Sequence, residues 1–178
     1  SPVFLVLAIM IKRDSEGEVF FRQTRVTQYG RTFGIYKFRT MVKNAESLGA
    51  QVTSQNDMRV TKVGNMLRSC RLDELPQLIN ILLGDMSFVG TRPEVPRYVV
   101  AYTNEMKATL LLPAGVTSVA SIAYKDEDQL LQNAKNVDEV YINEVLPGKM
   151  AWNLKSIKEF SFLQDIKTMI DTVLAVLR

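Results

Sequence analysis

The 178-residue sequence contains no histidine, which excludes a Ser-His-Asp triad, a Cys-His pair and histidine-ligated zinc. It contains one cysteine, Cys70, so an internal disulfide and a CxxC motif are excluded as well, and this usage fits a reducing cytoplasm. We expect Cys70 to be a small buried side chain rather than a nucleophile. Any catalysis must then rely on carboxylates, on Lys and Arg, and on a metal that prefers oxygen ligands, such as Mg²⁺.

The apolar run at the start of the chain is too short to span a membrane. It extends from Val3 to Ile11 and ends at Lys12 and Arg13, whereas a bilayer needs about 20 residues. It is an ordinary buried helix, or the second half of a re-entrant membrane helix with Pro2 at the bend and the two cations at the headgroups. It lacks the cationic start and the cleavage site of a signal peptide. Because the first residue is Ser1 and not Met, we expect the chain to be a fragment.

The last stretch of the chain has the spacing of an amphipathic helix. Apolar residues recur three and four positions apart from Phe160 to Leu177, with Asp165, Lys167 and Asp171 on the other side. We expect this apolar face to pack on the core, in preference to a helix that lies in the membrane interface.

Positive charge is concentrated in the first half of the chain. Between Val19 and Ala45 every charged residue is Lys or Arg, although the formal net charge is only +3. Such a segment favours an anionic partner, which can be a phosphate, a nucleic acid or a lipid surface. The alternative is a solvated face without a partner.

The sequence predicts one domain, residues 1–178, of mixed α and β character and richer in helix. Alternating apolar and basic residues from Glu18 to Met41, with a turn at Tyr29 and Gly30, predict a β-hairpin in which Lys37 and Arg39 share one face. Helices are predicted at Val63 to Cys70, at Pro76 to Leu83 with Gly84 as the stop, at Arg97 to Leu110 and over most of Asp126 to Glu144. Ala45 to Asn56 is predicted as a helix end and loop, and Thr117 to Tyr124 as an extended segment.

An adjacent acidic pair is the main candidate for chemistry. Asp73 and Glu74 come just before Pro76, which is tolerated only in a first helical turn, so the pair lies at a helix N-terminus. The helix dipole and the nearby Arg68 and Arg71 favour the ionised form. One carboxylate can then attack phosphorus while its neighbour holds Mg²⁺. The alternative is a helix-capping acid beside surface ion pairs.

Several basic residues can complete a phosphate site. Arg92 stands in a proline-rich turn that aims its guanidinium, Lys37 and Arg39 belong to one strand face, and Lys125 follows an apolar run. Taken alone, each of these basic residues is interpreted as a solvated surface charge. Together they can neutralise the two phosphates of a sugar nucleotide, and the sequence does not show whether they converge.

The motifs resemble those of the bacterial sugar transferase family, the monotopic phosphoglycosyl transferases that initiate exopolysaccharide, O-antigen and glycoprotein glycans. The resemblance runs nearly end to end. It is carried by LDELPQLIN at 72–80 and LLGDMSFVGTRPEVP at 82–96, and supported by FFRQTRV, YKFRTM, NDMRVTKVGNMLR and the closing SFLQDIKTM.

The resemblance implies an α+β fold: a helix-rich single domain with a small antiparallel hairpin, surface amphipathic helices and part of an N-terminal re-entrant membrane helix. Residues 1–11 are the remnant of that helix, and Ser1 and Pro2 form its bend. It also implies that Asp73 attacks the sugar-bearing phosphorus of a UDP-sugar, expels UMP and holds the phosphosugar until polyprenyl phosphate takes it. Glu74 binds Mg²⁺, with Asp73 close to the metal.

The family's phosphate-binding and nucleotide-binding cations correspond to Lys37, Arg68, Arg92 and Lys125. The expected location is the cytoplasmic face of the bacterial inner membrane, with UDP-sugar, polyprenyl phosphate and lipid as partners, no nucleic acid, and an oligomer possible. Two alternatives remain open. One is direct in-line transfer in a ternary complex with Asp73 only as a metal ligand, and the other is a non-catalytic module that binds anionic lipid. The sequence does not identify the sugar.

Overall fold

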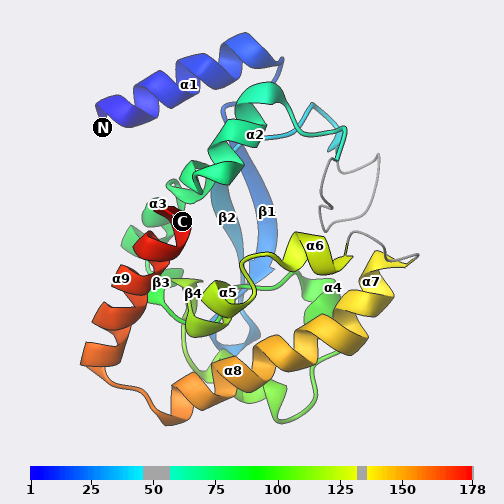
Figure 1. Ribbon diagram of the computed structural model, residues 1–178, viewed down its shortest axis with the longest axis vertical. Helices are drawn as coiled ribbons and strands as arrows, with labels where there is room; N and C mark the ends of the chain where they lie inside the picture. The colour runs from blue at the N-terminus through cyan, green and yellow to red at the C-terminus, as the bar shows by residue number, and fades with distance from the viewer. Residues whose placement is uncertain (46–56, 132–135, 178) are drawn as a thin grey trace.

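A computed structural model describes residues 1–45, 57–131 and 136–177 (Figure 1). The chain mixes helices with two small sheets, as the sequence predicts. The expected loop from Ala45 to Asn56 lies outside the described residues after Ala45, and so do residues 132–135 of the predicted helical region.

The predicted hairpin is confirmed and forms the middle of the molecule. Strands β1 (Phe20–Val26) and β2 (Thr32–Phe38) are antiparallel, and the turn between them uses left-handed backbone at Tyr29 and Gly30. One face of β2 buries Phe33 and Ile35 against Met86. Alternation along the strand therefore aims Lys37, which lies on that same face, toward the segment that carries the acidic pair.

The N-terminal helix lies at one end of the molecule (Figure 1). Helix α1 (Pro2–Asp14) buries only Leu7 and Ile11, which pack on Phe38 and on Leu67 of helix α2 (Lys62–Ser69). Phe4 and Met10 are partly buried against the same cluster, and the exposed large apolar residues of α1 are Val3, Leu5, Val6 and Ile9. Among the described residues, no helix combines the length and the apolar content that crossing a bilayer requires.

Helix α2 approaches the end of the hairpin very closely. A Cβ atom on Gly64 would lie 2.1 Å from the Thr40 carbonyl oxygen, so only glycine permits this contact. The next elements are a short 3₁₀ turn, η3 (Leu72–Glu74), and helix α3 (Gln77–Leu82). Gly84, with positive φ, follows the end of α3 and is the predicted stop. Buried Asn80 fixes α3 on β2, because it accepts from the Tyr36 N–H and donates to the Gly34 carbonyl.

A parallel two-stranded sheet, which the sequence reading did not predict, pairs β3 (Met86–Val89) with β4 (Ala114–Thr117). The extended segment expected from Thr117 to Tyr124 is wrong, since Ser118 caps helix α5 (Val119–Ala123) by accepting from the Ser121 N–H.

A second core fills the other end of the molecule. It includes Val95, Tyr98, Tyr102, Leu131, Tyr141, Val145, Leu146 and Met150. The elements around it are α4 (Pro96–Val99), η4 (Met106–Leu111), α6 (Glu127–Leu131), α7 (Val137–Val140), the π-helical turn η5 (Tyr141–Val145) and α8 (Leu146–Lys158). The single helix expected from Arg97 to Leu110 is therefore wrong, because α4 ends at Val99 and the chain turns before η4.

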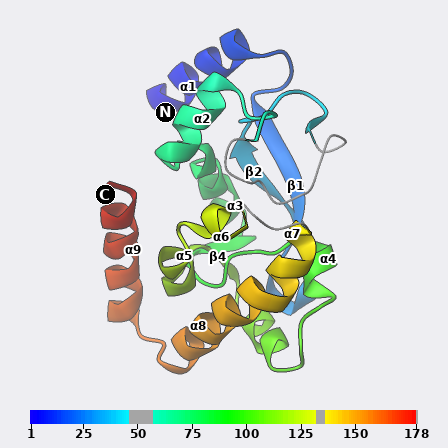
Figure 2. The same cartoon turned by 45° about the vertical axis from the view of Figure 1, so that its right-hand side comes forward.

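The last helix presents its apolar face outward, contrary to expectation. Helix α9 (Phe162–Leu177) runs along one side of the molecule and contacts α5, β3 and β4 (Figures 1 and 2). Its inner face carries Thr168, which is buried, and Thr172, whose hydroxyl lies 2.6 Å from that of Thr117. The outer face exposes Leu163, Ile166, Ile170 and Leu174. The prediction of a core-facing apolar stripe is wrong because threonine hydroxyls make the inward contacts.

Candidate active site

The acidic pair occupies a turn that the backbone forces between α2 and α3. Arg71 adopts a left-handed conformation, with φ of 54°, and this reverses the chain after α2. The following turn, η3, carries Asp73 and Glu74, and Pro76 is the N-cap of α3. The pair therefore lies just before a helix, where the sequence predicted it.

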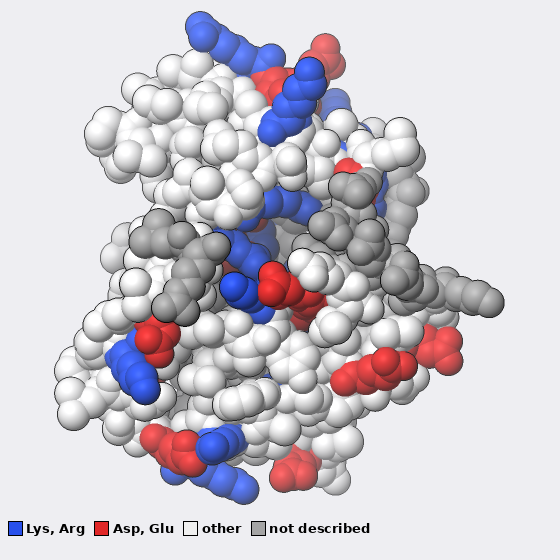
Figure 3. All heavy atoms as spheres, viewed as in Figure 1, with Lys and Arg blue, Asp and Glu red and all other residues white. Residues whose placement is uncertain are grey.

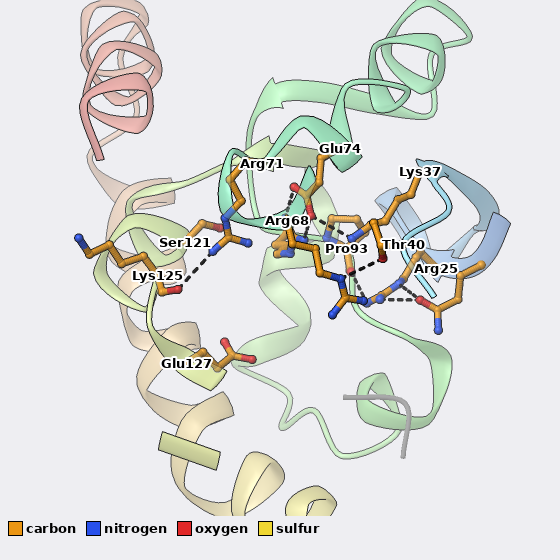
Figure 4. A network of polar contacts seen from close by, with 12 residues as sticks. Arg25, Lys37, Thr40, Arg68, Arg71, Glu74, Pro93, Ser121, Lys125 and Glu127 are labelled. Carbon is orange, nitrogen blue, oxygen red and sulfur yellow. Dashed lines mark hydrogen bonds and ion pairs between the residues drawn. The ribbon is translucent and has the colours of Figure 1, made fainter. Parts of the chain in front are cut away.

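Glu74 is the centre of a buried ion cluster (Figure 4). Its carboxylate accepts from Lys37 Nζ at 2.9 Å and from Arg92 Nη1 at 3.0 Å, and Arg92 Nη2 donates to it as well. Its side chain is 12% exposed. Residues from a strand, a turn and a proline-containing loop thus converge, although they are far apart in sequence.

The cations determine the ionisation of Glu74. Burial opposes the charged form, but the attraction and hydrogen bonds of Arg92 and Lys37 outweigh burial and hold the pKa of Glu74 well below its usual range. Arg92 responds with a pKa raised above its usual value, mainly through attraction to Glu74. Burial lowers the pKa of Lys37, and attraction to Glu74 opposes that shift.

Asp73 differs from its neighbour. Burial raises its pKa above the usual value, attraction to Lys37 works against this, and repulsion from Glu74 adds to it. Attraction to Arg68 favours the ionised form, as predicted, but burial of the side chain has the larger effect on the pKa. No described residue donates a hydrogen bond to the Asp73 carboxylate, which leaves its oxygens available for other partners.

Two further arginines support this cluster from the side (Figure 4). Arg68 donates from Nε to the Thr40 hydroxyl at 2.9 Å, and its charge attracts Asp73. Arg25, which the sequence analysis did not single out, donates to the Pro93 carbonyl at 3.1 Å and so fixes the loop that carries Arg92.

Other predicted site residues lie elsewhere. Arg39 does not join Lys37, because its guanidinium donates to the Ile11, Ser15 and Glu16 carbonyls at the end of α1. Lys125 borders the cavity, but its ammonium points away from Glu74 (Figure 4). Ser1 and Pro2 begin α1, at the end of the molecule drawn at the top of Figure 1.

A cavity of about 760 Å³ opens beside the acidic pair. Glu74, Arg71 and Arg92 line one part of it, and residues of α3, β4, α5, α6, α8 and α9 line other parts. Asp73 is not among the lining side chains. Figure 3 shows basic and acidic side chains side by side in a hollow near the centre of this face. Cys70 also lines the cavity and is exposed, so the expectation of a buried cysteine is wrong.

The residues present fit a metal site that substrate completes. No group of three acidic or cysteine side chains among the described residues can hold a metal alone. Magnesium commonly binds one or two carboxylates and takes its other ligands from phosphates and water. Asp73 and Glu74 supply two such carboxylates, and Glu74 also accepts hydrogen bonds from Lys37 and Arg92.

A second buried cluster was missed by the sequence analysis. Lys149 Nζ lies 2.8 Å from Glu127, 3.6 Å from Glu94 and 3.0 Å from the Tyr141 hydroxyl, which donates to Glu94. A sequence signal was available: Lys149 falls at the same helical spacing as the buried residues Leu146, Met150 and Asn153 of α8.

Comparisons with known proteins match the whole chain. The model of the family described as "Bacterial sugar transferase" matches residues 1–178. The chain is 36% identical, over 99% of its length, to a UDP-N-acetylgalactosamine-undecaprenyl-phosphate N-acetylgalactosaminephosphotransferase of Aeromonas hydrophila. It is 38% identical, over 97% of its length, to a UDP-glucose:undecaprenyl-phosphate glucose-1-phosphate transferase of Escherichia coli (strain K12). The chain spans 40% of the first relative and 36% of the second.

Proposed function

Because the chain belongs to the bacterial sugar transferase family, we propose that it transfers a sugar 1-phosphate from a UDP-sugar to polyprenyl phosphate and releases UMP. The product is a polyprenyl-diphosphate-sugar, which starts an exopolysaccharide, O-antigen or glycoprotein glycan. The names of the two relatives support this reaction class. They name different sugars, so the class of reaction carries over while the sugar stays open.

The observation that carries the proposal is the convergence of Asp73, Glu74, Lys37 and Arg92 beside a cavity. The Asp73 carboxylate, to which no described residue donates a hydrogen bond, lies near Lys37 and Arg92, whose positive charges suit a diphosphate. The cavity volume of about 760 Å³ is in the range of small-molecule sites.

In the first step, a carboxylate oxygen of Asp73 attacks the sugar-bearing phosphorus. The bond from this phosphorus to the bridging oxygen breaks, and UMP leaves with that oxygen. Lys37 and Arg92 exchange Glu74 for phosphate oxygens and stabilise the negative charge that develops there. Asp73 then carries the sugar phosphate as an acyl phosphate.

In the second step, an oxygen of polyprenyl phosphate attacks the same phosphorus. The bond between phosphorus and the Asp73 oxygen breaks and the carboxylate is regenerated. Asp73 and Glu74 would hold Mg²⁺, which neutralises charge on the diphosphate.

The lipid acceptor requires the site to work at a membrane, and we place it at the cytoplasmic face of the bacterial inner membrane. The exposed apolar residues of α1 and α9 support this arrangement. We propose that residues 1–11 form the second half of a re-entrant helix, with its bend at Ser1 and Pro2 and with Lys12 and Arg13 at the headgroups.

A UMP-release assay tests the proposal. The purified protein is incubated with polyprenyl phosphate and each of a panel of UDP-sugars, with Mg²⁺ or with EDTA. We expect Mg²⁺-dependent UMP release with at least one sugar. An absence of UMP with every UDP-sugar, from folded protein, would overturn the assignment.

A further inference from the structure

The second buried cluster contains two carboxylates with unequal support. Glu94 is held by the Tyr141 hydroxyl and by Lys149, and Arg25 also attracts it. Glu127 has only the ion pair with Lys149, at 2.8 Å, and no described residue donates a hydrogen bond to its carboxylate. Glu127 therefore retains acceptor capacity that Glu94 has already used.

Glu127 is also the more accessible of the two. Its side chain is 21% exposed and lines the cavity, whereas the Glu94 side chain is 7% exposed and does not line it. Figure 4 shows the Glu127 carboxylate pointing away from the Lys125 ammonium. The cavity wall therefore presents a carboxylate on α6 that is positioned by a lysine 8% exposed on α8.

The two parts of the cavity differ in the polar groups that line them. The part near η3 has Arg71 and Arg92, which suit phosphates. The part near α5 and α6 carries hydroxyl groups and charges of both signs, from Ser121, Tyr124, Lys125, Asp126, Glu127 and Lys149. Lys149 is already paired with Glu127 and lies close to Glu94, so the Glu127 carboxylate is an acceptor left on this side of the cavity. An ionised carboxylate only accepts hydrogen bonds, and it therefore favours a neutral group with several O–H donors.

We propose that Glu127 is a specificity-determining residue that accepts hydrogen bonds from sugar hydroxyls of the bound sugar nucleotide, while Lys149 positions its carboxylate. This inference rests on the proposed function and names the part of the substrate that the second half of the cavity recognises. Both the transferred sugar and the ribose carry such hydroxyls, so the experiment distinguishes them.

Two variants and one control test this role. Glu127→Gln keeps the shape and removes the charge, Glu127→Ala removes the group, and Glu144→Gln changes an exposed glutamate of η5. Each purified protein is tested for melting temperature, for Kd of UDP and of the UDP-sugar that supports UMP release, and for kcat and KM. The UDP-sugar series includes deoxy analogues that lack one hydroxyl each.

We expect Glu127→Ala to raise the Kd and KM for the UDP-sugar about 10- to 100-fold, with a smaller change in kcat and with Glu144→Gln unchanged. One deoxy analogue should bind the wild-type protein more weakly than the complete UDP-sugar does. Glu127→Ala should bind this analogue and the complete UDP-sugar with equal affinity. An unchanged Kd for UDP assigns the contact to the transferred sugar, and a Kd raised equally for UDP assigns it to the ribose.

Unchanged Kd values in both Glu127 variants would overturn the inference, and so would a loss of kcat that only follows a lower melting temperature. These outcomes leave the proposed function standing as long as the wild-type protein releases UMP. A wild-type protein that neither binds a UDP-sugar nor releases UMP would overturn both proposals.

Discussion

Arg92 and Lys37 hold the same carboxylate in different ways. Both terminal nitrogens of Arg92 donate to Glu74, whereas Lys37 offers one ammonium at 2.9 Å. A guanidinium makes two hydrogen bonds in fixed directions and so orients the carboxylate, whereas a lysine ammonium mainly supplies positive charge. The geometry of the cluster therefore depends more on Arg92 than on Lys37.

We expect Arg92→Lys to lower kcat/KM for UMP release by about 10- to 100-fold, because the two-pronged grip on phosphate is lost. The free energy of unfolding should fall by about 1.5 to 3 kcal/mol, because one buried hydrogen bond to a charged group is lost while Glu74 keeps two positive partners. Arg97→Lys is the control, because Arg97 pairs with Asp138 through a side chain 48% exposed. Wild-type kinetics in Arg92→Lys would contradict this role.

The sequence predicted some of the residues that come together around Glu74, and it missed others. Asp73 and Glu74 were found from their position before Pro76, and Arg92 from its turn. Arg39 was misplaced because strand alternation ends at Phe38, where β2 ends. Glu127 was missed because its partner Lys149 comes from a helix that only tertiary packing brings beside it.

Among the secondary-structure elements, α3 is attached to β2 by the Asn80 amide and by the packing of Ile81 on Phe33 and Ile35. Asn80 is fully buried and satisfies the Tyr36 N–H and the Gly34 carbonyl, both of β2. The strand face carrying Lys37 is thereby held against the segment carrying Glu74. The position of the ion cluster depends on this attachment.

Asn80→Ala should lower the free energy of unfolding by about 2 to 4 kcal/mol, because it leaves two buried backbone groups without partners. Urea denaturation measures this change. Asn104→Ala, at an exposed position, should stay within about 0.5 kcal/mol of the wild type. Equal stabilities for the two variants would show that Asn80 does not attach α3 to the hairpin.

Elements with local signals were predictable and the others were not. The hairpin, α2 and α3 follow from alternation, helical periodicity and the Gly84 stop. The β3–β4 pair joins strands separated by a long connection, so no local pattern reveals it. For α9, the apolar periodicity predicted the helix but not which of its faces turns inward. The face that turns inward carries Thr168 and Thr172.

At the scale of the whole molecule, the exposed apolar residues of α1 and α9 are the proposed membrane-binding surface. Leu163→Glu should weaken binding to vesicles that contain anionic lipid by about tenfold, because an apolar side chain that is 78% exposed loses its contact with lipid. Val100→Glu is the matched control, because Val100 is the C-cap residue of α4 and is 87% exposed. Vesicle sedimentation measures both, and equal binding would contradict the assignment.

The formation of a covalent intermediate on Asp73 is the central claim. Intact-mass spectrometry after incubation with UDP-sugar and Mg²⁺, without lipid acceptor, tests it most directly. The account predicts a gain of one sugar phosphate in the wild-type protein, its removal by polyprenyl phosphate, no gain in Asp73→Asn and a normal gain in Asp171→Asn. An active wild-type protein without the adduct, or an adduct in Asp73→Asn, would contradict it.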